Sequence, residues 1–347
     1  MTSTKVGKLV QTNILFASLQ HRSLAILQLR SYSWKYTGPI FDAHTHIWEN
    51  TNLTQTVEEQ RHLGVKSQLI IIHLPEIRAI IEEQYPDTFI FAKYLSTQNI
   101  VNSKIGLLLE EINQMREQGF SLAKMWAAPA WRNYYKGYEG TFRLTDTRYR
   151  PIFDKLASEG FPLLLHMADP DTYYATNYAN SEKFGTKEEH LEELEQLLQS
   201  YPDLQFQLAH FAAQPEIHRL PHLAEWFETY DNVVVDTASS RWMARELSKE
   251  PDIAREFLIH FSTRILFGTD ATLNASANPV EGSQLSPYNA RFLAQRILWE
   301  TNDQHTPLPF PDKDTEAIGG TFINGLNLPQ RVLRNLYWAN GRRLYNY

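Results

Sequence analysis

The sequence FDAHTHIW at residues 41–48 places two histidines at the end of an apolar segment, and the rest of the chain is interpreted around it. Residues 39–41 predict a short strand that ends in polar residues. Successive side chains of a strand point to opposite faces, so His44 and His46 share one face. Two imidazoles placed this way can bind one ion of zinc or of another first-row metal. A His-x-His pair alone is a weak signal, so a metal site requires further ligands from other parts of the chain.

Downstream of this stretch, apolar runs alternate with segments of helical pattern. We predict further strands at 68–73, 88–92, 121–126, 161–166, 204–210, 232–236 and 264–270. Helices are predicted at 54–63, 76–84, 103–118, 147–159, 186–200, 220–230, 241–260, 289–300 and 329–343, with Ser103 as one N-cap and a capping box at Thr186 and Glu189. Eight strands alternating with helices indicate an α/β fold, a single-domain (β/α)8 TIM barrel over residues 39–347. An open doubly wound sheet is the alternative, but no G-x-G-x-x-G follows the first strand.

Composition narrows the class of protein. The chain has 347 residues, of which 43% are hydrophobic, and a net charge of −7 without a basic stripe that would favour nucleic acid. It has no cysteine, so any metal must be bound by His, Asp or Glu. The chain contains no run of about 18 apolar residues, so we expect no membrane span. We therefore expect a small-molecule substrate, with neither nucleic acid nor membrane as a partner.

Two segments depart from the strand–helix rhythm. Residues 1–38 contain Lys and Arg but no acid, and 30–33 (RSYS) resemble a mitochondrial processing site. We interpret 1–38 as an N-terminal extension, either disordered or a transit peptide, which predicts a cytoplasmic location or, as the alternative, the mitochondrial matrix. Residues 127–145 are rich in Trp, Tyr and Phe, and we interpret them as a loop over the mouth of the site. A surface loop packed by its own aromatic side chains is the alternative.

Polar residues end most of the predicted strands, and in a barrel these ends open on the face where active sites lie. Five of the 12 histidines fall at such ends. The strand-end residues are His44, His46, His73, Lys124, His166, His210, Asp236 and Asp270. Imidazoles and carboxylates at so many ends of one barrel predict a metal-dependent active site.

Four motifs together carry a resemblance to a known family. FDAHTHIW, FPLLLH, LQFQLAHFA and RILFGTD occur in this order and resemble the amidohydrolase superfamily. The branch that looks most similar is the amidohydrolase-related (amidohydrolase 2) group, which includes aminocarboxymuconate-semialdehyde decarboxylase, related aromatic-acid decarboxylases and sugar lactonases. The resemblance runs from about residue 39 to the C-terminus and implies a TIM barrel.

The resemblance implies that His44, His46, His166 and Asp270 bind one divalent metal ion, with zinc as the expected metal, and that His210 faces the metal-bound water or the substrate. Three imidazoles and one carboxylate leave a position for water, as catalytic zinc requires. The metal lowers the pKa of that water from ~15.7 towards ~7. Asp270 and His210 are the predicted catalytic residues, since both can move protons at this site.

The remaining strand-end residues are assigned to the substrate pocket. Lys124 is expected to anchor substrate or to be structural, although in some branches of the superfamily a lysine on this strand is carboxylated and bridges two metals. Trp126, His73 and Asp236 are predicted pocket residues. Asp169 and Asp171 follow the fifth strand closely enough to touch substrate, but acids in loops are usually solvated.

Function follows from the metal site. We predict a metal-dependent hydrolase that acts on a small carbonyl substrate, a lactone, ester or amide. The alternative is non-oxidative decarboxylation of an aromatic or unsaturated carboxylic acid, which uses the same ligands. A non-catalytic metal-binding barrel is a second alternative, disfavoured because all four ligands are present. The resemblance also allows a homodimer.

Overall fold

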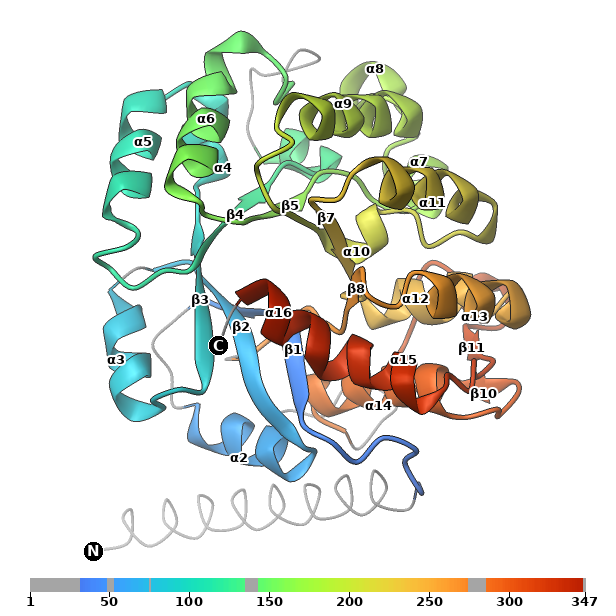
Figure 1. The fold of residues 1–347 in the computed structure, drawn as a ribbon. Coiled ribbons are helices and arrows are strands. Elements are labelled where there is room, and N and C mark those ends of the chain that lie inside the picture. The colour runs from blue at the N-terminus through green and yellow to red at the C-terminus, as the bar shows by residue number, and fades with distance from the viewer. Residues whose placement is uncertain (1–31, 49–52, 75, 135–142, 274–284, 346–347) are drawn as a thin grey trace, which may run out of the picture.

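The computed structural model describes residues 32–48, 53–74, 76–134, 143–273 and 285–345. Over these residues a nine-stranded parallel sheet has the order β8-β7-β6-β5-β4-β3-β2-β1-β9, and helices surround it (Figure 1). The strands are β1 (Ile40–Ile47), β2 (Val65–Ile72), β3 (Phe89–Tyr94), β4 (Leu122–Trp126), β5 (Leu163–His166), β6 (Phe206–Leu208), β7 (Val233–Asp236), β8 (Ile265–Leu266) and β9 (Ala271–Thr272).

The last two strands are two halves of one barrel strand. β8 pairs with β7, and β9, five residues further along the chain, pairs with β1. Between them the backbone N–H of Ala43 donates to the carbonyl of Phe267 at 2.7 Å, and the N–H of Asp270 donates to the carbonyl of His44 at 2.8 Å. These bonds join the eighth strand to the first, so the predicted (β/α)8 barrel is confirmed.

The barrel has two hydrophobic clusters because side chains alternate along each strand. One cluster lies between the strands and the outer helices and includes Ile70, Phe91 and Leu165. The other fills the barrel interior with residues of the opposite parity, such as Leu69 and Leu164. Leu344 and Tyr345 of the C-terminal helix α16 (Asn340–Tyr345) pack on the interior cluster, with the Tyr345 ring 5.9 Å from that of Phe41. The helix therefore covers the end of the barrel at which the strands begin (Figure 1).

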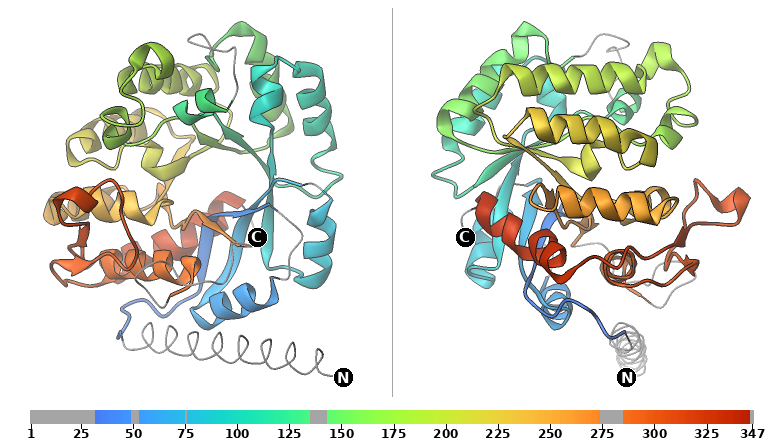
Figure 2. Two further views of the ribbon diagram at one scale, coloured as in Figure 1. Left: turned by 180° about the vertical axis from the view of Figure 1, so that it is seen from behind. Right: turned by 45° about the vertical axis from the view of Figure 1, so that its right-hand side comes forward.

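Helices follow most strands and cover the outside of the sheet (Figure 2). They are α2 (Thr54–His62), α3 (Ile77–Gln84), α4 (Thr97–Val101), α5 (Ile105–Gln114), α6 (Arg150–Glu159), α7 (Asp171–Tyr174), α8 (Ser181–Phe184), α9 (Lys187–Ser200), α10 (Ala209–Ala212), α11 (Leu220–Thr229), α12 (Ser240–Leu247), α13 (Pro251–His260), α14 (Pro287–Glu300) and α15 (Gln330–Arg334). Short 3-10 turns lie at η1 (Pro129–Asn133), η2 (Thr147–Tyr149), η3 (Ile217–Arg219) and η4 (Glu316–Ile318), and a π-helical turn, η5 (Asn335–Ala339), joins α15 to α16.

Several predicted boundaries differ from the structure. The capping box of α9 is present, but Ser103 is not a helix cap: it has a positive φ of 53°, and α5 begins at Ile105 after an N-cap without a side-chain bond. The predicted helix at 241–260 is two helices, because Pro251 lacks an N–H and starts α13. Between the predicted helices at 289–300 and 329–343, where we predicted no strand, the chain forms an antiparallel pair, β10 (Thr306–Pro307) and β11 (Phe322–Ile323), that projects from the barrel (Figure 2).

Residues 32–38, which we assigned to the N-terminal extension, contact the barrel. The backbone N–H of Tyr36 donates to the Glu300 carboxylate at 2.8 Å, and Tyr36 is only 7% exposed. The Lys35 ammonium donates to the Asn327 side chain at 2.7 Å. Residues 1–31 lie outside the described part of the chain, so the extension and the two predicted locations stay predictions. Among the described residues, no helix is both long and apolar enough to cross a membrane.

Candidate metal centre and active site

A β-bulge in β1 turns both predicted histidine ligands into the barrel. Asp42 pairs with Gln68 and Thr45 with Ile70, so β1 holds one residue more than β2 over this stretch. Phe41 and Ala43 belong to the interior cluster, and after the bulge His44 and His46 line the cavity at the opposite end of the barrel. The prediction that the two imidazoles share a face is therefore right, and the apolar strand predicted from residue 39 continues through both histidines to Ile47.

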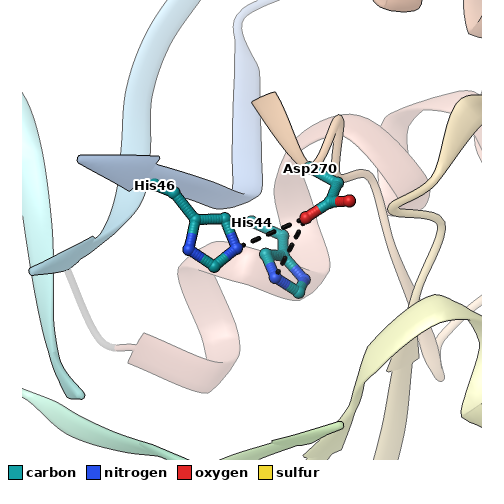
Figure 3. Close-up of side chains that lie close together, drawn as sticks. All are labelled: His44, His46 and Asp270. Atoms are coloured by element: carbon teal, nitrogen blue, oxygen red, sulfur yellow. Dashed lines mark ion pairs between the residues drawn. The ribbon is translucent and has the colours of Figure 1, made fainter. Parts of the chain in front are cut away.

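Three of the four predicted ligands come together in one group (Figure 3). His44, His46 and Asp270 each offer an atom within 4.8 Å of the others. Asp270 Oδ1 lies 3.3 Å from His46 Nε2 and 3.7 Å from His44 Nε2. Two ligand atoms that each lie ~2.1 Å from a tetrahedral ion are ~3.4 Å apart, so these spacings suit one divalent ion.

The protonation states in this group also suit a cation. His44 Nε2 is buried and has no hydrogen-bond partner among the described residues, which a metal ion would correct. Burial lowers the pKa of His46 to about 4, so its imidazole is neutral at pH 7 and can act as a ligand. Burial opposes ionisation of Asp270, but the hydrogen bond with His46 and the nearby imidazoles hold its pKa well below the ordinary value.

Asp236 was predicted to contact substrate, and the structure places it elsewhere. It is fully buried beneath His44, outside the set of residues that line the cavity, and its Oδ2 accepts from His44 Nδ1 at 2.9 Å and from Gln207 Nε2 at 2.7 Å. Its Oδ1 accepts the backbone N–H of His210 at 2.9 Å. With Nδ1 bound to Asp236, His44 directs Nε2 towards the metal group. A second group of His44, His210 and Asp236 is also close enough for a metal, but these bonds already occupy both oxygens of Asp236.

His73 is a pocket residue, as predicted, and it also contacts a candidate ligand. Its Nε2 lies 3.1 Å from His46 Nδ1, on the side of that ring away from Asp270. Burial lowers the pKa of His73 to about 3, so both rings are neutral and share one proton in this bond. His46 therefore keeps a bare Nε2 when its Nδ1 donates to His73.

His166 and His210 lie beside each other at the ends of β5 and β6. His166 Nδ1 is 3.3 Å from His210 Nε2. His166 lines the same cavity as the group of His44, His46 and Asp270, but it is not close enough to belong to that group. Burial lowers the pKa of His210 to about 3, and its imidazole is neutral. The residues from His210 to Ala213 all have φ between 54° and 61°, a left-handed turn that is costly for L-residues. This turn aims His210 into the cavity directly after Ala209, which faces the interior cluster.

The cavity that contains these residues has a volume of about 530 Å³. Its walls are aromatic: Trp48, Tyr94, Trp126 and Tyr134 line it together with the imidazoles. Trp48 stacks on His73 with ring centroids 3.4 Å apart, and Trp126 lies 6.1 Å from Tyr134. The strand-end analysis found Trp126 but missed Trp48 and Tyr94, which the alternation of β1 and β3 could have placed on the inner face. Of the predicted aromatic loop, Tyr134 lines the cavity, whereas residues 135–142 lie outside the described residues.

Lys124 brings a positive charge to the floor of this cavity. Its side chain is 2% exposed, and its Nζ has no hydrogen-bond partner among the described residues. Burial lowers its pKa to about 8, against the opposing effect of Asp236 and Asp270. The cavity thus combines a candidate metal group, aromatic walls and one buried ammonium group.

Comparisons with known proteins agree with this architecture. A model of the amidohydrolase family matches residues 107–347. Two solved structures with a similar fold are 5-carboxyvanillate decarboxylases. The one from Novosphingobium aromaticivorans, complexed with manganese and 4-hydroxy-3-methoxy-5-nitrobenzoic acid, has 14% identity and a TM-score of 0.53 over 90% of this chain and 97% of its own. The one from Sphingomonas paucimobilis has 10% identity and a TM-score of 0.52 over 89% and 99%.

No curated protein sequence matches the chain. The family match covers more than half of it, and the fold of the two decarboxylases covers nearly all of it. The motifs predicted the same superfamily, and the prediction is confirmed. The chain belongs to the amidohydrolase family and is an enzyme.

Proposed function

We propose that this enzyme catalyses the metal-dependent, non-oxidative decarboxylation of a planar aromatic carboxylic acid. The observation that carries the proposal is the cavity, in which a buried ammonium and a metal group lie between aromatic walls. This reverses the order of our sequence-based prediction, which placed hydrolysis first. The aromatic walls and the buried charge are the reasons, since neither is required for attack by water on a simple lactone or amide.

The ammonium of Lys124 favours an anionic substrate. A buried charge without a partner is costly, because the folded protein replaces none of the hydrogen bonds that water would make. A carboxylate in the cavity would supply a charge-assisted hydrogen bond to Nζ. The function of the site thus explains a residue that would otherwise only destabilise the barrel.

The aromatic walls favour a flat substrate. Trp48 and Tyr134 are 51% and 71% exposed, so large apolar rings face the mouth of the cavity where a ligand could cover them. Aromatic rings prefer offset stacking or edge-to-face contact with other rings, at centroid separations of about 4.5–7 Å. A benzoic acid derivative is both anionic and flat, and its size suits a cavity of about 530 Å³.

One divalent ion would be held by His44, His46 and Asp270, and we propose His166 as the fourth ligand. Nitrogen and carboxylate ligands suit zinc, our first expectation, and also manganese, which one structural neighbour binds. When bound, the ion supplies a Lewis acid that holds and polarises an oxygen of the substrate. The buried Nε2 of His44, which has no other partner among the described residues, supports this assignment.

The chain's own residues would position the substrate and move one proton. Decarboxylation breaks the bond between the ring carbon and the carboxylate carbon, releases CO₂, and places a proton from solvent on the ring carbon. Lys124 would hold the acid beside the ring walls. Asp270 and His210 lie at the same end of the cavity and would relay the proton, because one is ionised and the other is a neutral imidazole.

Hydrolysis of a lactone, ester or amide is the second candidate. The family description favours it, and the same ligands would serve a metal-activated water with Asp270 as the base. A homodimer and the metal's identity also stay predictions.

The two reactions are separated by the fate of solvent atoms. Purified enzyme with its bound metal measured by elemental analysis is incubated with hydroxylated benzoic acids and, separately, with lactones, esters and amides. We expect CO₂ release and, in D₂O, one deuterium on the product ring carbon. Incorporation of ¹⁸O from labelled water into a cleaved lactone, ester or amide, without CO₂, would refute decarboxylation and support hydrolysis. His44→Ala, which removes a metal ligand, serves as the inactive control in both assays.

A further inference from the structure

We infer that Asp169 is a positioning residue that fixes the orientation and the tautomer of His166, and that Tyr178 holds Asp169 in place. The inference rests on the proposed metal site, because it explains how His166 keeps one ring nitrogen without a proton, as a metal ligand requires. It corrects the expectation that Asp169 is a solvated loop acid, since its side chain is only 5% exposed.

The contacts of the Asp169 carboxylate indicate that it positions His166. Its Oδ1 lies 3.0 Å from His166 Nε2, and its Oδ2 accepts the hydroxyl of Tyr178 at 2.6 Å. Both carboxylate oxygens are therefore engaged inside the protein. Tyr178 is itself buried, so its hydroxyl has been brought out of water to make this bond.

These contacts determine which nitrogen of His166 carries the proton. An ionised carboxylate only accepts hydrogen bonds, so His166 must donate from Nε2. A neutral imidazole with a proton on Nε2 has a lone pair on Nδ1, the nitrogen that faces His210 across 3.3 Å. A carboxylate behind a ligand histidine is a common way to fix a ring for metal binding, and it parallels Asp236 behind His44.

A buried lysine fastens the same loop to its neighbour. The Lys187 ammonium, on α9, donates to the backbone carbonyl of Asp169 and to that of Ala213, which ends the left-handed turn after His210. The loops that follow β5 and β6 are thus tied together behind the two imidazoles. Asp169 is held at its carboxylate by Tyr178 and at its backbone by Lys187, which limits the movement of His166.

The test uses the full chain and measures the tautomer directly. In metal-free protein labelled with ¹⁵N-histidine, we expect His166 to show one tautomer protonated at Nε2, with its signals assigned by comparison with His166→Gln. Asp169→Ala should abolish this preference and weaken metal binding by roughly 10- to 100-fold in competition with a chelator, the usual effect of removing such a carboxylate. Tyr178→Phe removes only the hydroxyl and should give a smaller loss of affinity, and it covers the case in which Asp169→Ala fails to fold.

Asp171→Ala is the matched control. Asp171 lies two residues further along and pairs with Arg219 at 2.7 Å, outside the residues that line the cavity, so its loss should leave the tautomer and the metal affinity unchanged. An unchanged tautomer in both Asp169→Ala and Tyr178→Phe would overturn the inference. A changed tautomer with unchanged metal affinity would support the positioning of His166 but remove it from the proposed ligand set, which separates the two claims.

Discussion

Replacing Lys124 with Met should make the metal-free protein more stable and the enzyme less active. The ammonium is buried without a hydrogen-bond partner among the described residues, and burial lowers its pKa from 10.5 to about 8. Each pKa unit corresponds to about 1.4 kcal/mol, so the charged form costs about 3 kcal/mol in the folded state. Met has similar length, fills the same space and needs no hydrogen bond. At pH 7 we therefore expect Lys124→Met to raise the free energy of unfolding by up to about 3 kcal/mol.

The pH dependence of protein stability tests independently whether the buried Lys124 ammonium is destabilising. Below pH 8 the lysine is charged in both states, and the full cost is present. Between pH 8 and 10.5 the unfolded chain binds more protons than the folded protein, so the stability of the wild type rises with pH and the cost disappears. Urea unfolding of chelator-treated protein at pH 7 and pH 10 should show a large difference between variant and wild type at pH 7 and a small one at pH 10.

Activity should change in the opposite direction. A hydrogen bond to a charged group contributes about 1.5–3 kcal/mol, so kcat/KM for an aromatic acid should fall by roughly 10- to 100-fold. Lys187→Met is the control for stability: its ammonium donates to two carbonyls, and its loss should destabilise the protein. If Lys124→Met lowers stability at pH 7 and leaves kcat/KM unchanged, Lys124 is a structural residue and the case for an anionic substrate fails.

Three further predictions concern the metal group and the fold. His44→Ala should reduce bound metal from about one equivalent per chain to a small fraction by elemental analysis, and full retention would exclude it as a ligand. Gly268→Ala would place a Cβ 3.1 Å from that of His44, closer than ordinary contact, so chelator competition should show roughly tenfold weaker metal binding with little loss of stability. Burial raises the pKa of Glu193 from 4.5 to about 7, so wild-type stability should fall by about 3 kcal/mol as pH rises from 4.5 to 7. Glu193→Gln should remove that fall in urea unfolding at pH 5 and pH 8, and an identical pH profile would contradict it.

The barrel could be predicted because its signals are local. Each strand is an apolar run, each helix has a periodic pattern, and their alternation determines a parallel sheet. The same alternation places one residue in two on the inner face, which is why strand-end residues such as His166 and Lys124 were found from spacing alone. The division of the eighth strand into β8 and β9 was not predicted. It depends on the bonds of Phe267 and Asp270 to the neighbouring β1, and no local pattern records a partner more than 200 residues away.

The roles of the acids that contact the histidines could not be predicted from the sequence, for a different reason. Asp236 and Asp169 have the spacing of ordinary strand-end and loop acids, and only burial separates them from solvated ones. Their contacts with His44 and His166 are fixed by tertiary packing. A polar residue on the inner face of a short strand indicates proximity to the cavity, but it does not tell whether the side chain reaches the substrate or supports a ligand.

Backbone conformation at the site is the feature least visible in the sequence, and it has a physical cost. His210 and Asp270, the two proposed proton carriers, both have positive φ, at 57° and 56°, without being glycine. Such conformations cost of order 1–3 kcal/mol each and persist only where other bonds hold them. Those bonds are present: Asp236 accepts the N–H of His210, and the N–H of Asp270 donates to the carbonyl of His44. Because Asp236 also binds the His44 ring, one buried carboxylate joins a proposed metal ligand to the strained backbone of a proposed proton carrier.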